Sequence, residues 1–372
     1  MGSYILKRLL LMIPTLFGIM LITFAVIQLV PGGPIEQIIA KLQGTGVDAL
    51  DRIGGGSGSE VQGEGAGAGQ QGGGSGEGSS YRGRKGLDPE FIKSLEKQFG
   101  FDKPAYQRFL TMVWNYLRFD FGESYFKSRP VIDLVIEKMP VSISLGLWLT
   151  LITYLISIPL GIRKAVKDGS AFDTWTSVVI IIGYAIPSFL FAILLIVLFA
   201  GGSYWSFFPI GRLHSDGASL MSWPEYILDY FWHMALPLFA MGISAFATMT
   251  LLTKNSFLDE IKKQYVVTAR AKGLTDRQVL YGHVFRNAML LVISGFPSAF
   301  LGAFFSSSLL IEQIFSLDGL GLLTFKAAID RDYPIMFATL YIFTLVGLVV
   351  NLISDLTYTW IDPRIDFETR EV

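Results

Sequence analysis

Cysteine is absent from this chain of 372 residues, which excludes disulfides, thiolate metal sites and cysteine nucleophiles and leaves the redox compartment open. The only three histidines, His214, His233 and His283, lie far apart in sequence and predict no metal site. Charged residues make up 16%, against about 25% in soluble domains. With 30 Lys and Arg against 31 Asp and Glu, no net charge favours a polyanion. These shortages argue against a soluble enzyme, a disordered scaffold and a nucleic-acid binder.

Long apolar stretches are abundant instead. Hydrophobic residues make up 51% of the chain, and the mean hydropathy is +0.48. A helix needs about 20 apolar residues to cross about 30 Å of hydrocarbon. The first stretch is too long for a signal peptide and lacks an A-x-A-like cleavage site, so we interpret it as a retained helix. We predict six spans, the third of which ends its helix partway at Gly201-Gly202; the stretches cover 9–30, 141–162, 174–211, 230–253, 287–311 and 333–361.

Basic residues predict the orientation of these spans. With the N-terminus inside, the cytosolic pieces hold 14 Lys and Arg, and the two short external loops hold three. This asymmetry favours a cytosolic N-terminus and a cytosolic C-terminus. The predicted organisation is an N-terminus with the first helix (1–30), an external loop (31–138), spans two to six (139–361) and a cytosolic tail (362–372).

The external loop combines a low-complexity insert with helical patterns. Residues 54–80 contain 13 glycines in 27 residues and cannot bury enough surface to fold, so we predict a flexible insert there. Amphipathic helices are predicted from Asp88-Pro89 to near Gly100, over 104–119 and over 131–138. Together they suggest a small helical cap over 88–138. The cap either packs on the helix ends or docks an external partner and shapes the pore mouth.

The cytosolic loop 254–286 carries seven basic residues and the pattern of a helix–turn–helix. Gly273 permits a turn with positive φ, and Thr275-x-x-Gln278 is a capping box for a second helix. One interpretation is an amphipathic pair resting on anionic headgroups. The other is a rigid knob that fits a cleft on a cytosolic partner, which the small residues Ala269, Ala271 and Gly273 favour.

Several motifs together resemble one family. The stretch TARAKGL at 268–274, followed by Arg286-Asn287-Ala288, resembles the EAA loop of permease subunits in ABC importers of the dipeptide/oligopeptide/nickel class. The long segment after the first span makes the chain most similar to the Yej-type branch, as a B-type subunit. Further motifs of the class are matched by Pro31-Gly32-Gly33-Pro34, Ile186-Pro187-Ser188-Phe189, His233 with Leu236-Pro237, Glu312 with Phe315 and Gly319-Leu320-Gly321, Arg331-Asp332-Tyr333-Pro334, and Asn351, Asp355 and Asp362-Pro363-Arg364.

The chain also departs from the pattern of the class. The Glu that gives the EAA loop its name is missing, because the corresponding position, six residues before Gly273, is Val267. Leu291 stands where the class often has a proline, and Gly33 stands where it usually has Asp. Family-wide roles of those side chains are therefore not transferred to this chain.

The resemblance implies an all-α membrane protein with the type I importer-like permease fold. It implies a pore-forming subunit that couples ATP hydrolysis by partners to the inward movement of peptides, with no catalytic site or cofactor in this chain. Partner ATPases would bind ATP and Mg. The implied partners are a second permease in a heterodimer, two cytosolic ATPase domains or one fused pair, an external peptide-binding protein and the lipid of a bacterial inner membrane, with no nucleic acid. The implied ATPase-coupling residues are Tyr265, Thr268, Ala269, Arg270, Ala271, Lys272, Gly273 and Leu274.

The remaining polar and aromatic residues in the spans allow more than one role. Phe300, Phe304, Phe305 and Ser307 could line a pore or gate, or pack against other helices. Asn351 and Asp355 are four residues apart in the last span and predict a helix–helix hydrogen bond.

Two other functions remain open: a secondary transporter and a non-transporting membrane scaffold. A secondary transporter would be expected to carry midplane ionisable residues and related halves. Neither signal is visible, because Asp355 lies near the cytosolic end of its span and the chain contains no strong internal repeat.

Overall fold

The computed structural model describes residues 2–30, 32–42, 89–201, 204–305 and 308–361. The predicted Gly-rich insert (54–80) and the tail (362–372) lie outside the described residues. The chain divides into two compact units, each described by itself. The first comprises Met1–Leu16, Asp133–Phe325 and Thr339–Val372, and the second comprises Phe17–Ile132 and Lys326–Ala338.

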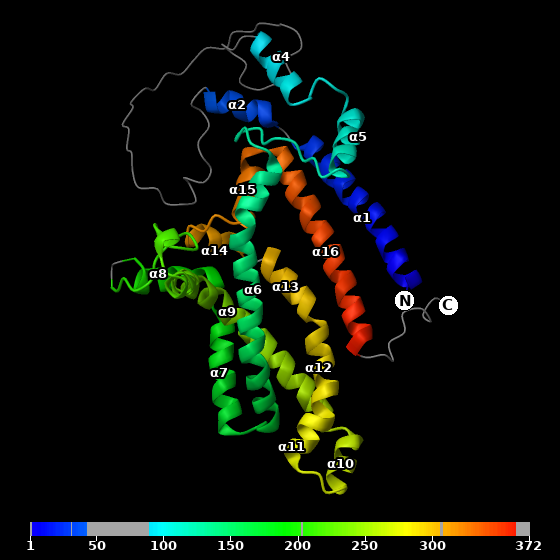
Figure 1. Cartoon of the computed structure of the whole chain (residues 1–372), viewed down its shortest axis with the longest axis vertical. Helices are drawn as coiled ribbons and strands as arrows, with labels where there is room; N and C mark the ends of the chain where they lie inside the picture. Colours follow the sequence, from blue (N-terminus) through cyan, green and yellow to red (C-terminus); the bar gives the residue numbers. More distant parts are fainter. Residues whose placement is uncertain (1, 31, 43–88, 202–203, 306–307, 362–372) are drawn as a thin grey trace, which may run out of the picture. The chain divides into compact units, whose positions relative to one another are not determined.

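Long apolar helices dominate the described chain, as the sequence predicts (Figure 1). Among the described residues, five helices are long and apolar enough to cross a membrane, or six if one bent pair forms a single span. Four of them are single elements: α1 (Gly2–Leu29), α6 (Val131–Val166), α9 (Trp223–Ile261) and α16 (Tyr333–Ile361). The predicted separate helix over 131–138 is wrong, because α6 runs through Pro140 without a break.

The third predicted span is a pair of helices rather than one. α7 (Ala171–Ala185) and α8 (Ser188–Phe199) meet at an angle of 94°. Pro187 disfavours helical backbone at the residue before it, and Ile186 is extended, with φ −85° and ψ 119°. α8 ends two residues before Gly201, near the predicted interruption. The proline motif at 186–189 is therefore the corner of a broken span.

The fifth predicted span is also interrupted. α12 (Phe285–Ser294) and α13 (Phe296–Phe305) are separated at Gly295, and α14 (Ser308–Ile314) follows the undescribed residues 306–307. A helix long and apolar enough to cross a membrane runs over Asp276–Phe300, from α11 (Asp276–Val279) into α13. The fifth predicted span is therefore confirmed as a span, but it begins and ends earlier than the predicted stretch 287–311.

A buried carboxylate explains the motif around Glu312. Glu312 is fully buried, and its Oε2 accepts a hydrogen bond of 2.7 Å from the backbone N–H of Leu322 in the first turn of α15 (Leu320–Asp330). Ser142 of α6 donates to Glu312 Oε1 (3.2 Å) and accepts from the N–H of Leu320 (2.9 Å). A Cβ at Gly319 would lie 2.5 Å from the Glu312 carboxyl carbon. Glu312 thus caps α15, and the cap requires glycine at 319.

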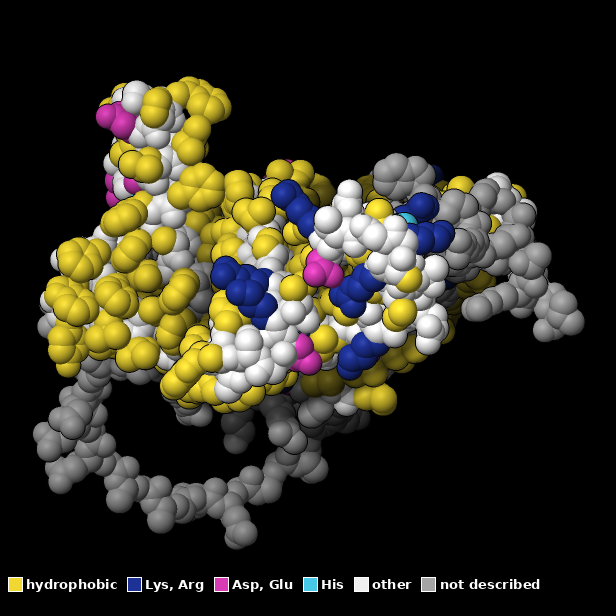
Figure 2. All heavy atoms as spheres, turned by 90° about the horizontal axis from the view of Figure 1, so that it is seen from below, with side chains coloured by type: hydrophobic (Ala, Val, Ile, Leu, Met, Phe, Trp, Pro, Cys, Tyr) yellow, Lys and Arg dark blue, Asp and Glu magenta, His cyan; other side chains and the backbone are white. Residues whose placement is uncertain are grey.

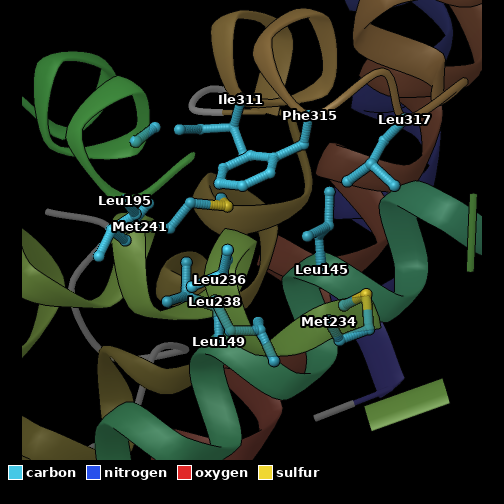
Figure 3. Close-up of a cluster of buried hydrophobic side chains, with 12 residues drawn as sticks. Leu145, Leu149, Leu195, Met234, Leu236, Leu238, Met241, Ile311, Phe315 and Leu317 are labelled. Atoms are coloured by element: carbon cyan, nitrogen blue, oxygen red, sulfur yellow. The ribbon is translucent and has the colours of Figure 1, made fainter. Parts of the chain in front are cut away.

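The core of the first unit is an aliphatic cluster between several helices (Figure 3). Leu145 and Leu149 of α6, Leu195 of α8 and Met234 of α9 are buried in it. Their side chains and that of Ile311 of α14 point toward one another (Figure 3). This packing joins α6, α8, α9 and α14.

Three short helices lie in the described part of the second unit: α2 (Pro34–Leu42), α4 (Pro89–Gln98) and α5 (Ala105–Tyr116). The predicted helices before Gly100 and after Pro104 are confirmed as α4 and α5, whereas α2 was not predicted. Ile35 and Ile39 of α2 pack with Ile92 and Leu95 of α4. These four side chains form a small core of their own.

Asp332 connects the start of α16 to the loop after α5. Its carboxylate accepts hydrogen bonds from the Ser124 hydroxyl, from the backbone N–H of Tyr125 (3.2 Å) and from that of Ile335 in the first turn of α16. Asp is a favoured N-cap residue, and proline is tolerated in a first helical turn. Asp332 and Pro334 thus give the Arg331-Asp332-Tyr333-Pro334 motif a local role as a helix start.

Candidate functional site

The candidate site is a short helical hairpin that follows α9. α10 (Gln264–Ala271) is followed by a turn, and α11 is followed by a π-helical segment (Leu280–Val284) that leads into α12. The predicted helix–turn–helix is therefore confirmed. The predicted capping box is present too, because Thr275 Oγ1 accepts from the N–H of Gln278 (3.4 Å) and Gln278 Oε1 accepts from the N–H of Thr275 (2.9 Å).

Gly273 closes α10 with a Schellman turn. Its φ is +84°, in the left-handed region that favours glycine. The N–H of Gly273 donates to the carbonyl of Arg270 (2.9 Å), and the N–H of Leu274 donates to that of Ala269 (3.4 Å). This pair of bonds satisfies carbonyls at the end of the helix. The turn of the hairpin is thus held by backbone hydrogen bonds within this chain.

One side of the hairpin is anchored in a core shared by several helices. Val266 and Ala269 are buried against Phe257 of α9, Val279 of α11 and Ala288 of α12. Ile162 and Ala165, near the end of α6, belong to the same core. Close packing of this kind makes the hairpin move with the ends of the long helices rather than independently of them.

Tyr265 ties the hairpin to its neighbours through polar contacts. Its hydroxyl donates a 2.6 Å hydrogen bond to Glu260 at the end of α9, and its side chain also hydrogen-bonds Asn287 of α12. Burial, together with the bond to Glu260, raises the pKa of Tyr265. The phenol therefore remains a hydrogen-bond donor at neutral pH.

The tip of the hairpin is exposed. Of the eight predicted coupling residues, Ala269 is buried and Tyr265 and Leu274 are half-buried, so these three face inward. The exposed five are Thr268, Arg270, Ala271, Lys272 and Gly273, which we call the hairpin tip. Figure 2 views the molecule from the end that carries α10 and α11 and shows Lys and Arg side chains over this surface. Arg270 Nε lies 3.2 Å from Asp276 Oδ1, but both side chains are largely exposed, so this pair adds little stability.

A cavity of about 320 Å³ lies beside the hairpin. Val166 of α6, Ile261 and Val266 contribute apolar lining, while Arg270 and Arg277 contribute charge. The exposed surface of the hairpin is therefore a projecting tip next to a hollow.

A buried ionic cluster fixes the helix ends near this core, and sequence analysis missed it. Lys164 of α6 is fully buried and lies 2.9 Å from Asp173 Oδ1 of α7, and its Nζ also donates to the hydroxyls of Thr176 (2.7 Å) and Ser177 (2.8 Å). Lys254 of α9 reaches the other Asp173 oxygen at 2.7 Å. The charges and hydrogen bonds compensate one another, which burial of a lysine requires. The sequence showed these residues only as separate basic and acidic positions.

Asp355 pairs with the first helix rather than with Asn351. Its Oδ2 accepts from the Tyr4 hydroxyl (2.7 Å) and lies 2.9 Å from Arg8 Nη2. Asn351, one turn earlier, is exposed. The predicted helix–helix hydrogen bond of Asp355 is therefore present. Its partners, Tyr4 and Arg8, are four residues apart and lie on one face of α1.

Two histidines converge on one carboxylate despite their separation in sequence. The Asp229 carboxylate of α9 lies 3.4 Å from His214 Nδ1 and 3.5 Å from His233 Nδ1, and it accepts from the N–H and hydroxyl of Ser215. His233 Nδ1 is closer to the backbone carbonyl of Asp229, at 2.9 Å. The His214 ring stacks on Tyr226, with ring centroids 4.0 Å apart. No group of three or more metal-ligating side chains was found among the described residues. The convergence is consistent with a polar tie between the 212–218 loop and α9.

The predicted pore residues are only partly described. Phe300 is half-buried in α13. Phe304 and Phe305 belong to the same helix, but their side chains are not described, and Ser307 lies outside the described residues. Their predicted role in lining a pore or gate therefore stays a prediction.

Comparison with known proteins gives one consistent family. Residues 157–367 match the model of the "binding-protein-dependent transport system inner membrane component" family. The chain is 66% identical over 372 residues to the peptidoglycan transport system permease protein YejB of Agrobacterium fabrum, and 56% identical over 370 residues to the inner membrane ABC transporter permease protein YejB of Escherichia coli O157:H7. Both alignments cover 100% of each chain. It is 30% identical to the oligopeptide transport system permease protein AppB of Bacillus subtilis, covering 99% of this chain and 100% of that one.

Proposed function

Because this chain belongs to the family of binding-protein-dependent transport system inner membrane components, we propose that it is one pore-forming subunit of an ATP-driven importer of peptides or peptide-containing compounds. The relatives are named as permeases for oligopeptides and for peptidoglycan. Peptide bonds are common to both of these named cargoes. In this proposal a second permease completes the pore, and an external binding protein delivers the cargo.

The observation that carries the mechanism is the anchored hairpin with its exposed tip. Its inner face shares a core with the long helices α6 and α9 and with the shorter α12, so a force on the tip would reach all three. A cytosolic ATPase that closes on ATP could thus shift the helices between two arrangements. ATP and Mg would be bound by that partner, because this chain contains no G-x-x-x-x-G-K-[ST] sequence.

The absence of cysteine makes a direct test possible, since a single introduced cysteine is the only thiol in the chain. We expect Ala271→Cys, at the hairpin tip, to cross-link to an ATPase subunit through a short thiol–amine reagent. Leu220→Cys is the matched control, because Leu220 is 91% exposed in the loop before α9 and would face the opposite side. Efficient cross-linking of Ala271→Cys to lipid-attached reagents, with none to the ATPase, would support the headgroup interpretation instead.

A further inference from the structure

The second unit encloses a cavity that the proposed coupling mechanism does not use. Its volume is about 270 Å³, and it is lined by the end of α1, the loop between α4 and α5, the middle and end of α5, the loop after α5 and the start of α16. Aromatic rings form much of its wall, among them Phe24, Phe101, Tyr125 and Tyr333.

Under the predicted orientation this unit is on the external side of the membrane, which is the side from which an imported peptide would enter.

One cation in the wall, Arg108, has no anionic partner among the residues that the structure describes. The Arg108 guanidinium carbon lies 4.7 Å from the ring centroid of Phe101 and 5.9 Å from that of Phe24. Its Nη2 donates to Gln28 Oε1 (2.9 Å), while its Nε is buried without a hydrogen-bond partner. Within the described part of the chain, no carboxylate forms an ion pair with Arg108. A guanidinium held by rings, with a donor left over, is suited to bind a carboxylate through its planar fork.

The lining supplies a further donor and one competing charge. Burial raises the pKa of Tyr125 to about 12, against the opposing effect of the Arg108 charge, so the phenol keeps its proton at neutral pH. Lys103 adds a second positive charge to the lining. Asp120 also lines the cavity, but its Oδ1 already accepts from the N–H of Gly122 (3.1 Å) and the side chain is exposed. The balance of the lining therefore favours an anionic group bound next to apolar surface.

We propose that this cavity is a subsite for the C-terminal residue of a peptide, with its carboxylate on Arg108 and its apolar side chain among the aromatic rings. The volume is slightly below that of pockets for drug-sized molecules, about 300–1,000 Å³, and suits one amino-acid residue rather than a whole peptide. The identity of the ligand as a peptide rests on the proposed function. The preference for a carboxylate next to an apolar group rests only on the cavity.

Two small probes test the preference without any transport. N-acetyl-phenylalanine carries the carboxylate and the apolar side chain, and N-acetyl-phenylalanine amide is its uncharged counterpart. We expect the acid to bind the purified permease in lipid nanodiscs at least about tenfold more tightly than the amide, because a charge-assisted hydrogen bond is lost in the amide. Binding is followed by saturation-transfer NMR. Equal affinity of the two probes on the unsubstituted protein would overturn the proposal.

Substitutions then locate the site. Arg108→Met keeps an unbranched side chain over Phe101 and should remove the preference for the acid, while Arg108→Lys should keep part of it. Arg118→Met is the matched control, because Arg118 also lies over a ring, 4.3 Å from the Trp114 centroid, but does not line the cavity. An equal loss in Arg108→Met and Arg118→Met would assign the effect to the fold of the unit and contradict the subsite.

A transport measurement separates cargo from the binding protein as the source of the carboxylate. If cargo supplies it, Arg108→Met should reduce import of peptides with a free C-terminus more than import of C-terminally amidated peptides. Docking of the empty binding protein should then be unchanged. Weakened docking of the empty binding protein, with equal effects on both peptides, would place the carboxylate on the binding protein and overturn the cargo assignment. A permease that binds the acid probe but moves no peptide would refute the proposed function and leave the carboxylate preference standing.

Discussion

Gly319 lies where any side chain would collide with the Glu312 carboxyl group. Glycine is therefore needed here because it has no side chain, and not because of an unusual backbone conformation. We expect Gly319→Ala to displace Glu312 and remove the hydrogen bond to the N–H of Leu322, destabilising the protein by about 1–3 kcal/mol. The midpoint of thermal unfolding in detergent measures the change.

The control for this substitution is Gly347→Ala in α16, where an added Cβ meets no atom within 4 Å. It should leave stability unchanged or raise it by up to about 1 kcal/mol, because alanine is the better helix former. If both alanine variants unfolded at the same temperature, the capping interpretation of Glu312 would be wrong.

Asp332 gives a pH-dependent prediction at the same scale. Burial raises the pKa of Asp332, although Ser124 and backbone N–H groups donate to it. A carboxyl group whose pKa is higher in the folded than in the unfolded state contributes stability at low pH, and the contribution is lost as pH rises through the folded-state pKa.

Asp332→Asn cannot titrate at this position. The difference in unfolding midpoint, wild type minus Asp332→Asn, should therefore fall as pH is raised from about 4, the ordinary carboxyl range, to 8. A difference that is constant or grows over this interval would contradict the raised pKa.

Pairings between distant residues could not be predicted from the sequence, because nothing local specifies them. The sequence predicted a helix–helix hydrogen bond for Asp355 but could not say which residue of another helix is its partner. The partners are Tyr4 and Arg8, whose own four-residue spacing became meaningful only once α1 and α16 were described. Lys164 likewise looked like a topology signal and is a buried member of an ionic cluster.

At the scale of elements, local signals were sufficient for the hairpin and insufficient for the broken spans. Thr275, Gln278 and Gly273 act through hydrogen bonds and backbone angles within a few residues, so the helix–turn–helix was predictable. The angle of 94° between α7 and α8 was not, because apolarity marks contact with lipid and does not report where a helix turns. Pro187 disfavours helical backbone at Ile186, but a proline in an apolar stretch does not fix the angle between the two helices.

Gly273 provides the prediction that belongs to the hairpin. An added Cβ would meet no atom of this chain within 4 Å, so Gly273→Val costs only the strain of positive φ, about 1–2 kcal/mol, in the isolated subunit. In the complex, bulk at the hairpin tip would also press on the ATPase. We expect Gly273→Val to insert normally and to lose ATPase recruitment or cargo-stimulated hydrolysis, while binding-protein docking persists.

Gly273→Asn separates strain from bulk, because Asn tolerates left-handed backbone better than Val. Gly282→Val is a second control, since Gly282 has open space around it and an ordinary negative φ. Normal coupling by Gly273→Val in reconstituted vesicles would argue against the hairpin as the lever.

At the scale of the whole molecule, the basic residues predict the topology. A reporter fused after Val372 should be cytosolic, and one inserted at Gly67 should be external, because the short loops hold 14 basic residues on one side and three on the other. If a tag at Gly67 were protected from protease added outside intact cells, the predicted orientation would be wrong. The assignment of the hairpin to the cytosol would then be wrong as well.

The ion pair between Asp355 and Arg8 also bears on how the chain is made. Its two helices lie at opposite ends of the sequence, and Tyr4 and Asp355 are 351 positions apart. The ribosome therefore synthesises α1 long before α16, and Arg8 can pair with Asp355 only after α16 has been made. A chain that stalls before α16 keeps this charge unpaired, so closure of the pair distinguishes a finished subunit from a truncated one that cellular proteases could remove.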